Sequence, residues 1–311
     1  MKYKIAVIVC YFGHFPTYFN QWLKSCSFNN TIDFLIYTDC QWDGKTPSNV
    51  HIKKTNLKAI KEKAECAVGF DVTLQKPYKL CDFRPAFGMI FKNDLLDYDF
   101  WGYCDLDMIA GDIRGFITDD ILEKYDKINR WGHLCFVRNT DECNSRYMLD
   151  GTRYNYKTIL THTRDYGFDE CDLTNIYIKH DFPLYILPDS AYADIRARYS
   201  RFCVQGKDNY PFQLFFWDNG HVYRAYWKNN KINYNEYLYI HFKKRGDLPV
   251  HFASELNSFL ITNSGFYEKN EISISTIRKY NNYPGKLYEK IEDTKYKISS
   301  TAYKAKRKFF E

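Results

Sequence analysis

The sequence lacks any apolar run close to the ~20 residues that a membrane-spanning helix needs. The N-terminal stretch KIAVIVCYF (4–12) is too short to span a bilayer, and no small-residue cleavage site follows it. We therefore interpret this stretch as a buried β-strand rather than a signal peptide, and we expect the protein to be cytoplasmic.

Cysteine and glycine motifs that mark common site classes are also missing. None of the ten cysteines belongs to a CxxC pair, and Cys10 and Cys104 lie inside apolar runs, where a free thiol behaves as a small hydrophobic side chain. The sequence contains neither GxGxxG nor GxxxxGKS/T. These absences argue against a disulfide framework, a dinucleotide-binding Rossmann enzyme and a P-loop NTPase.

Most of the chain carries no net charge. The formal net charge is +6, and residues 277–311 hold ten lysines and arginines against four acids, a difference of six that accounts for all of it. A neutral body argues against a nucleic-acid partner. The basic tail has Leu287 and Ile291 at helical spacing. It is typical either of an amphipathic helix on an anionic membrane surface or of a solvated or packed terminal helix.

Strand-like and helix-like segments alternate through the first 115 residues, which is typical of a parallel α/β sheet. Shorter strand-like pieces follow, without a repeat or a low-complexity linker. We expect a catalytic domain at 1–265, with a nucleotide-binding half (1–115) and an acceptor-side half (116–265), and then a basic helical tail at 266–311. The expected strands of the first half are 4–12, 32–39, 50–55 and 99–107, and its expected helices are 15–26, 56–69 and 84–96.

Two aspartates end the aromatic segment DFWGYCDLD (99–107). Asp105 and Asp107 end a predicted buried strand, at the edge where parallel sheets bind ligands. Their like charges need compensation, and Mn²⁺ or Mg²⁺ provides it because these cations accept hard oxygen ligands. The alternative is a structural turn or a helix cap. Asp97 and Asp99 form a second D-x-D before the strand, where solvated turn carboxylates are expected.

The element order and two blocks, KPYKLCDFRPAFG (76–88) and DFWGYCDLDMIAGDI (99–113), resemble the GT-A class of nucleotide-sugar glycosyltransferases. They are most similar to an uncharacterised family from bacterial capsule and surface-polysaccharide gene clusters, over roughly residues 3–250. The resemblance implies a GT-A-like, Rossmann-type mixed sheet flanked by helices. It also implies a UDP-sugar donor, Mn²⁺ or Mg²⁺ at the D-x-D, and transfer of a hexose to a glycan or lipid-linked glycan acceptor in capsule or lipopolysaccharide synthesis.

The resemblance implies roles for residues late in the chain as well. A histidine at this place often completes the metal shell of GT-A enzymes, and His241 in YIHFKKRG (239–246) matches it. Lys243, Lys244 and Arg245 follow, and we expect them to bind the donor diphosphate. The alternatives are a hydrogen-bonded core histidine and a solvated strand end.

The segment KLCDFRP (79–85) offers further donor contacts. Similar enzymes contact the nucleotide or the donor sugar in this neighbourhood, so we expect Lys79, Asp82 and Arg84 to take part. The alternative is a charged loop in which Asp82 caps a helix.

Residues at the ends of the first two predicted strands are candidates for the uracil site. Tyr11 and Phe12 are the last residues of the first predicted strand, and we expect them to pack on the base. Thr38 and Asp39 end the second strand, and we expect them to hydrogen-bond the edge of the base.

An inverting reaction needs a carboxylate that removes the proton from the acceptor hydroxyl. YGFDECD (166–172) offers Asp169 and Glu170, and inverting GT-A enzymes often have an acid at a comparable distance after the D-x-D. The alternatives are an exposed acidic turn and a retaining mechanism, which needs no base there. Three other aspartates are rivals for the same role: Asp172, Asp189 and Asp194.

Two other functions compete with glycosyl transfer. A nucleotidyltransferase acting on sugar phosphates can share the sheet and the aspartate pair. Such enzymes usually have a glycine-rich loop with Lys or Arg after the first strand, where this sequence has CYFGHFP. A non-catalytic sugar-binding protein suits the 28 tyrosines and 24 phenylalanines, but it leaves the strand-end carboxylates without a purpose.

Overall fold

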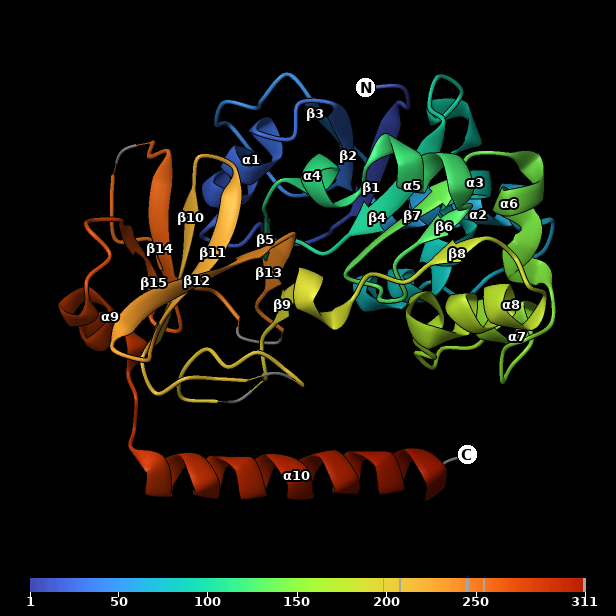
Figure 1. The fold of residues 1–311 in the computed structure, drawn as a ribbon. Helices are drawn as coiled ribbons and strands as arrows, with labels where there is room; N and C mark the ends of the chain where they lie inside the picture. The colour runs from blue at the N-terminus through green and yellow to red at the C-terminus, as the bar shows by residue number, and fades with distance from the viewer. Residues whose placement is uncertain (198, 207, 244–245, 254, 310–311) are drawn as a thin grey trace.

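The computed structural model gives a mixed α/β protein with a long C-terminal helix along one side of the body (Figure 1). This architecture confirms the expected combination of a mixed sheet and flanking helices. No helix among the described residues is both long and apolar enough to cross a membrane. The structure describes residues 1–197, 199–206, 208–243, 246–253 and 255–309.

The largest sheet in the described ranges has the strand order β3-β2-β1-β4-β7-β6-β8. Its strands are β1 Ile5–Cys10, β2 Ile32–Thr38, β3 Val50–Lys54, β4 Phe100–Cys104, β6 Lys127–Ile128, β7 Leu134–Arg138 and β8 Leu184–Tyr185. β1 to β4 run parallel, whereas β7 is antiparallel to β4. The carboxyl ends of β1, β2 and β4 therefore share one edge, where α/β proteins bind ligands.

Alternation along β1 buries this sheet on both faces. Ile5 and Val7 belong to the core that includes α1 (Phe19–Ser27). Ala6 belongs to the core on the other face, which includes α2 (Leu57–Val68). Successive side chains of a strand point to opposite faces, so an unbroken apolar run fits a strand covered on both sides.

The prediction of a regular helix over 84–96 is wrong. The chain there forms three short helical turns: η1 (Pro77–Ala86), α3 (Phe87–Ile90) and η2 (Lys92–Asp94). Pro85 lies inside η1, and a proline there does not prevent a helix from beginning. The break comes later, because α3 ends at Ile90 and a separate 3₁₀ turn follows at Lys92–Asp94.

The second half of the chain forms an antiparallel sheet in the order β12-β11-β10-β14-β15. Its strands are β10 Gln213–Asp218, β11 His221–Lys228, β12 Lys231–Tyr237, β14 Ser258–Thr262 and β15 Gly265–Glu268. Helix α9 (Ile274–Asn281) packs on this sheet through Ile277. The boundary expected after residue 265 thus falls within the first residues of a strand, and the chain leaves the body only after α9.

A small sheet in the order β5-β13-β9 connects the two halves. Its strands are β5 Met108–Ala110, β9 Ala193–Asp194 and β13 Tyr239–His241. His241 lies opposite Met108 on one side and opposite Asp194 on the other. This register brings residues from three distant parts of the sequence to the end of β4.

The remaining helices cover the sheets and form the tail. The last of them, α10, spans Lys286–Phe309 and runs along the outside of the body (Figure 1). The others are α4 Ile113–Phe116, α5 Asp119–Lys124, α6 Asp141–Ser145, η3 Arg146–Met148, α7 Tyr156–Thr161, η4 Phe168–Asp172, α8 Leu173–Lys179 and η5 Asp189–Ala191.

Candidate active site

Asp105, Asp107 and His241 meet where β4 ends and the small sheet begins. The Nε2 atom of His241 lies 3.4 Å from Oδ1 of Asp107 and 3.7 Å from Oδ2 of Asp105. One ligand atom from each of the three residues lies within 4.8 Å of the others. This group can hold a metal ion, because it combines two carboxylates with an imidazole nitrogen.

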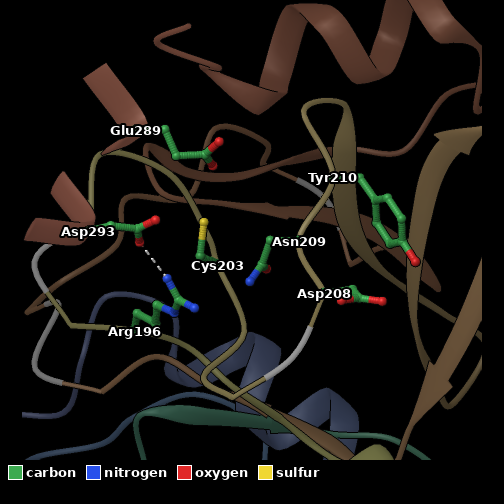
Figure 2. Close-up of a pocket in the computed structure, with 7 residues that line it drawn as sticks. All are labelled: Arg196, Cys203, Asp208, Asn209, Tyr210, Glu289 and Asp293. Atoms are coloured by element: carbon green, nitrogen blue, oxygen red, sulfur yellow. Dashed lines mark hydrogen bonds and ion pairs between the residues drawn. The ribbon is translucent and has the colours of Figure 1, made fainter. Parts of the chain in front are cut away.

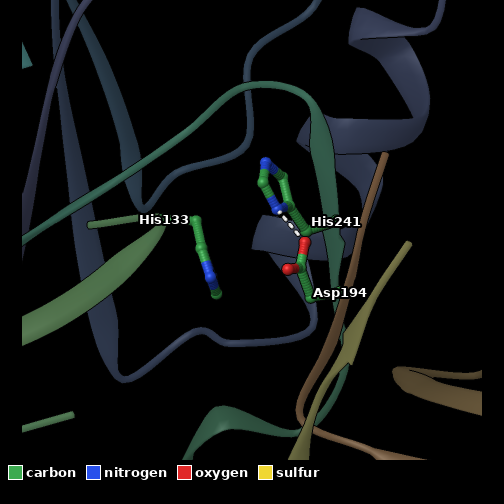
Figure 3. A group of neighbouring side chains, drawn as sticks. All are labelled: His133, Asp194 and His241. Carbon is green, nitrogen blue, oxygen red and sulfur yellow. Dashed lines mark hydrogen bonds and ion pairs between the residues drawn. The ribbon is translucent and has the colours of Figure 1, made fainter. Parts of the chain in front are cut away.

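The carboxylate of Asp194 fixes the ring of His241. Nδ1 of His241 lies 2.8 Å from Oδ1 of Asp194 (Figure 3), and the other oxygen of Asp194 accepts from Lys243 Nζ at 3.2 Å. Burial opposes a charge on His241, but Asp107, Asp194 and Asp105 outweigh it and raise its pKa to about 10. The surroundings of this ring therefore favour positive charge.

His133 is a buried member of the site that the sequence reasoning missed. Its ring stacks on that of His241 with centroids 4.6 Å apart, and its Nδ1 lies 2.7 Å from the hydroxyl of Tyr239. Burial lowers the pKa of His133, and the neighbouring His241 lowers it further, so this ring is neutral. The residue precedes β7, whose first residue pairs with the last residue of β4. Only that long-range register places it beside Asp105.

Arg84 connects Asp105 to the acidic segment 166–172, which was predicted to supply the base. Its Nη2 donates to Oδ1 of Asp105, while its Nη1 donates to Oδ2 of Asp169 at 2.8 Å and to the carbonyl of Gly132 at 3.0 Å. Oδ1 of Asp105 is thus engaged by Arg84, and Oδ2 is the oxygen that faces His241. The structure places Arg84 among carboxylates of the site, and the expected contact of Arg84 with the donor stays a prediction.

The two candidate bases, Asp169 and Glu170, differ in solvent exposure. Asp169 is buried and paired with Arg84, whereas the neighbouring Glu170 is only partly buried. Burial raises the pKa of Asp169 to about 7, although Arg84 opposes the rise. Burial also raises the pKa of Glu170; Asp105 adds to this rise, and Lys243 and Arg84 oppose it. Glu170 directly follows the partner of Arg84 in the chain and is the more exposed of the two acids.

Lys79 and Asp82 have a different role from the donor contact that we expected. Both are only 1% exposed, and Lys79 Nζ donates to Asp82 at 2.7 Å and to the carbonyl of Ile159 at 2.9 Å. Asp82 in turn accepts backbone N–H groups of Tyr166 and Gly167 at 2.9 and 2.8 Å. This buried pair clamps the loop that leads into η4, and so it holds Asp169 and Glu170 in position without reaching a ligand.

The expected uracil residues differ in how much they are exposed. Tyr11 and Phe12 are half-buried at the end of β1, and burial, Cys40 and Asp107 raise the pKa of Tyr11. Asp39 is exposed and accepts the backbone N–H of Gly13 at 2.7 Å. Thr38 is fully buried and accepts the backbone N–H of Cys40, so it is not open to a nucleotide.

The remaining candidates are those proposed for the diphosphate and one rival base. Lys243 is half-buried, and besides Asp194 it donates to Gln205 at 3.2 Å. Asp189 is exposed and accepts a hydrogen bond from the hydroxyl of Tyr192 at 2.9 Å. Lys244 and Arg245 lie outside the described residues.

The clamp formed by Lys79 and Asp82 predicts a large loss of stability on Lys79→Met. This change leaves the carboxylate of Asp82 buried without its cation, which typically costs about 3–5 kcal/mol. The free energy of unfolding from urea titrations measures it. Lys76→Met is the matched control, because Lys76 pairs with Asp165 at 2.6 Å but is 53% exposed. The control should cost less than about 1 kcal/mol. Equal losses for the two variants would contradict the clamp.

Comparison with known proteins connects the sequence to a family. No curated protein matches it. Similar solved structures include mouse xyloside xylosyltransferase 1 in its apo form, with 8% identity and a TM-score of 0.36, covering 63% of this chain and 88% of that one. The glycosyltransferase GlyE of Streptococcus pneumoniae TIGR4 is similar at 12% identity and a TM-score of 0.30, covering 61% and 46%. The galactosyltransferase LgtC with donor and acceptor sugar analogs is similar at 10% identity and 0.31, covering 61% and 75%.

Likenesses at these TM-scores assign neither a fold nor an activity. The family DUF6625, described as a family of unknown function, matches residues 7–270. That match covers most of the chain, so the protein belongs to DUF6625.

Proposed function

We propose that the protein is a metal-dependent glycosyltransferase that moves a hexose from a UDP-sugar to a glycan acceptor. The observation that carries the proposal is the convergence of Asp105, Asp107 and His241 at the carboxyl edge of the large sheet. The GT-A resemblance of the segments 76–88 and 99–113 supports the same reaction. On that resemblance we place the reaction in bacterial capsule or lipopolysaccharide synthesis, at the cytoplasmic side of the membrane.

The residues present suit Mn²⁺ or Mg²⁺. Carboxylate oxygens suit both cations, and an imidazole nitrogen favours Mn²⁺. The carboxylates of Asp105, Asp107 and Asp194 surround His241 with negative charge that suits a cation, and His241 would lose a proton on binding it. When bound, such a cation supplies Lewis-acid stabilisation of the negative charge that develops on the departing UDP.

The chain's own residues prepare this point in two ways. Arg84 engages one oxygen of Asp105, and Asp194 engages one nitrogen of His241, so that the second atom of each side chain is directed at the shared point. A side chain that is already hydrogen-bonded on its far side loses less conformational freedom when a ligand binds. For a histidine, that hydrogen bond also sets which ring nitrogen carries the proton. Lys243, next to Asp194, is the described member of the proposed diphosphate clamp.

For the donor base we propose Tyr11 and Phe12 at the end of β1, with Asp39 beside them. All three are at least partly exposed, and Asp39 is joined to this loop through Gly13. For the acceptor proton we propose Glu170 in an inverting reaction. Its raised pKa is suited to accepting a proton, and Asp169 supports it as the partner of Arg84.

The arrangement favours glycosyl transfer over the two alternatives. A nucleotidyltransferase needs a cationic, glycine-rich loop after β1, where the chain has CYFGHFP. A non-catalytic sugar-binding protein has no need for the two carboxylates of Asp105 and Asp107 beside His241 at the sheet edge. The decisive measurement is release of UDP from UDP-sugars, with and without Mn²⁺.

Replacing Asp107 tests the proposed metal site. Asp107→Asn removes one carboxylate charge and should lower Mn²⁺-dependent UDP release by roughly a hundredfold or more. Asp97→Asn is the control, since Asp97 is an exposed aspartate of the other D-x-D and should leave the rate unchanged. Equal UDP release in EDTA and in Mn²⁺ would overturn metal dependence.

Asp194→Asn tests whether Asp194 positions His241. Loss of this carboxylate should weaken Mn²⁺ binding about 10–100-fold, which is the usual cost of removing an outer-shell partner of a metal-binding histidine. Calorimetric titration with Mn²⁺ and UDP measures the affinity without turnover. Asp189→Asn serves as the comparison, because Asp189 bonds Tyr192 rather than His241. Unchanged affinity in Asp194→Asn would show that His241 does not need the contact.

Glu170→Gln tests the proposed base. The variant should transfer sugar ~10²–10⁴ times more slowly while UDP binding is retained, because a general base acts on the chemical step. Asp172→Asn, two residues further along η4, should retain the rate of the unmodified protein. A product with the anomeric configuration of the donor would remove the need for any base at this position.

A further inference from the structure

Helix α10 divides its side chains between a face directed at the body and a face directed at solvent. Over residues 286–298, the half-buried side chains are Glu289, Glu292, Asp293 and Tyr296, and the others are exposed. At 3.6 residues per turn these four lie on one side of the helix. The pattern therefore has the period of a helix that contacts the body along a single stripe.

Acidic residues make the contacts of that stripe. Asp293 pairs with Arg196 at 2.9 Å, Glu292 accepts the backbone N–H and the hydroxyl of Ser200 at 3.0 Å each, and Glu289 pairs with Arg201. Glu289, Asp293 and Arg196 line a polar cavity of about 430 Å³. Figure 2 shows the ion pair between Asp293 and Arg196 at one side of it. In the described part of α10, the acidic side chains therefore all bind groups of the body.

The opposite face is apolar and bordered by cations. Leu287, Ile291 and Ile298 are 76%, 42% and 65% exposed. Positions i, i+4 and i+11 fall within an arc of about 40° on a helix. Lys290 and Lys295, both exposed, lie on opposite sides of this arc. Exposed aliphatic side chains between lysines form the pattern of helices that lie in a membrane interface.

We propose that this face of α10, defined by Leu287, Ile291 and Ile298 with their flanking lysines, binds an anionic lipid surface. Charge complementarity selects this partner, because the acids of the helix are turned away from the face and the lysines remain on it. A lipid surface also accommodates an apolar stripe without a shaped groove. A second copy of the chain would have to bring an acidic counterpart for the same lysines.

The segment that α10 contacts leads directly to the candidate active site. Arg196 and Ser200 follow β9, whose last residue, Asp194, bonds His241. A membrane under α10 would therefore lie beneath the acceptor-side half of the chain. The inference does not depend on the proposed transfer reaction, because it rests on the surface of α10 alone.

Flotation with lipid vesicles tests the proposal on the full chain, without nucleotide or metal. The protein should bind phosphatidylcholine vesicles that contain phosphatidylglycerol, should bind pure phosphatidylcholine weakly, and should be released by high salt. Combined Leu287→Ser, Ile291→Ser and Ile298→Ser should lower the partition roughly tenfold or more. Lys290→Glu with Lys295→Glu should lower it by at least about fivefold per lysine.

Leu96→Ser is the matched control, because Leu96 is 73% exposed on the body and far from α10 in sequence. It should leave the partition unchanged. Absence of binding to anionic vesicles, or equal loss in the Leu96 control, would overturn the proposal. A dimer that dissociates when Leu287, Ile291 and Ile298 are replaced, without vesicle binding, would overturn it too and would assign the face to a second copy of the chain.

Discussion

The charge of Asp105 is the constraint on which the site depends. Asp105 follows a strand whose five residues are all buried, and removing a carboxylate from water is costly unless it is paired and hydrogen-bonded. Arg84 meets this need at one oxygen, and its planar fork reaches Asp169 at the same time. One guanidinium thus fixes β4, η1 and η4 relative to one another. A lysine, which is a point charge, could not hold two carboxylates in a set geometry.

Two halves of the chain contribute unlike parts to this point. The parallel strands of the first half bring Asp105 and Asp107 to a sheet edge, and the small sheet brings His241 and Asp194 from residues far along the sequence. Because His241 pairs with both β5 and β9 in that sheet, its position is set by backbone hydrogen bonds on two sides. The site therefore forms only when both halves are folded against each other.

Local sequence pattern predicted what depends on local physics. The apolar run of β1 and the buried run before Asp105 identified strands and a sheet edge, whereas His241 was named because of the resemblance to GT-A glycosyltransferases. Such patterns could not predict which residues that lie far apart in the sequence pair with each other. The position of His133 depends on the antiparallel register of β7, and the clamp role of Lys79 depends on its contact with Ile159 of α7, 80 residues away.

The same distinction applies to the tail. The net charge of residues 277–311 predicted a basic segment with some affinity for anionic surfaces. A net charge, however, only subtracts the four acids of this segment from its lysines and arginines. In the structure Glu289, Glu292 and Asp293 bind the body, so they do not dilute the charge of the exposed face. An acid that faces the body fixes the rotation of the helix, and that rotation turns Leu287 and Ile291 outward. The acids therefore determine which surface the tail presents, and the lysines determine what that surface attracts.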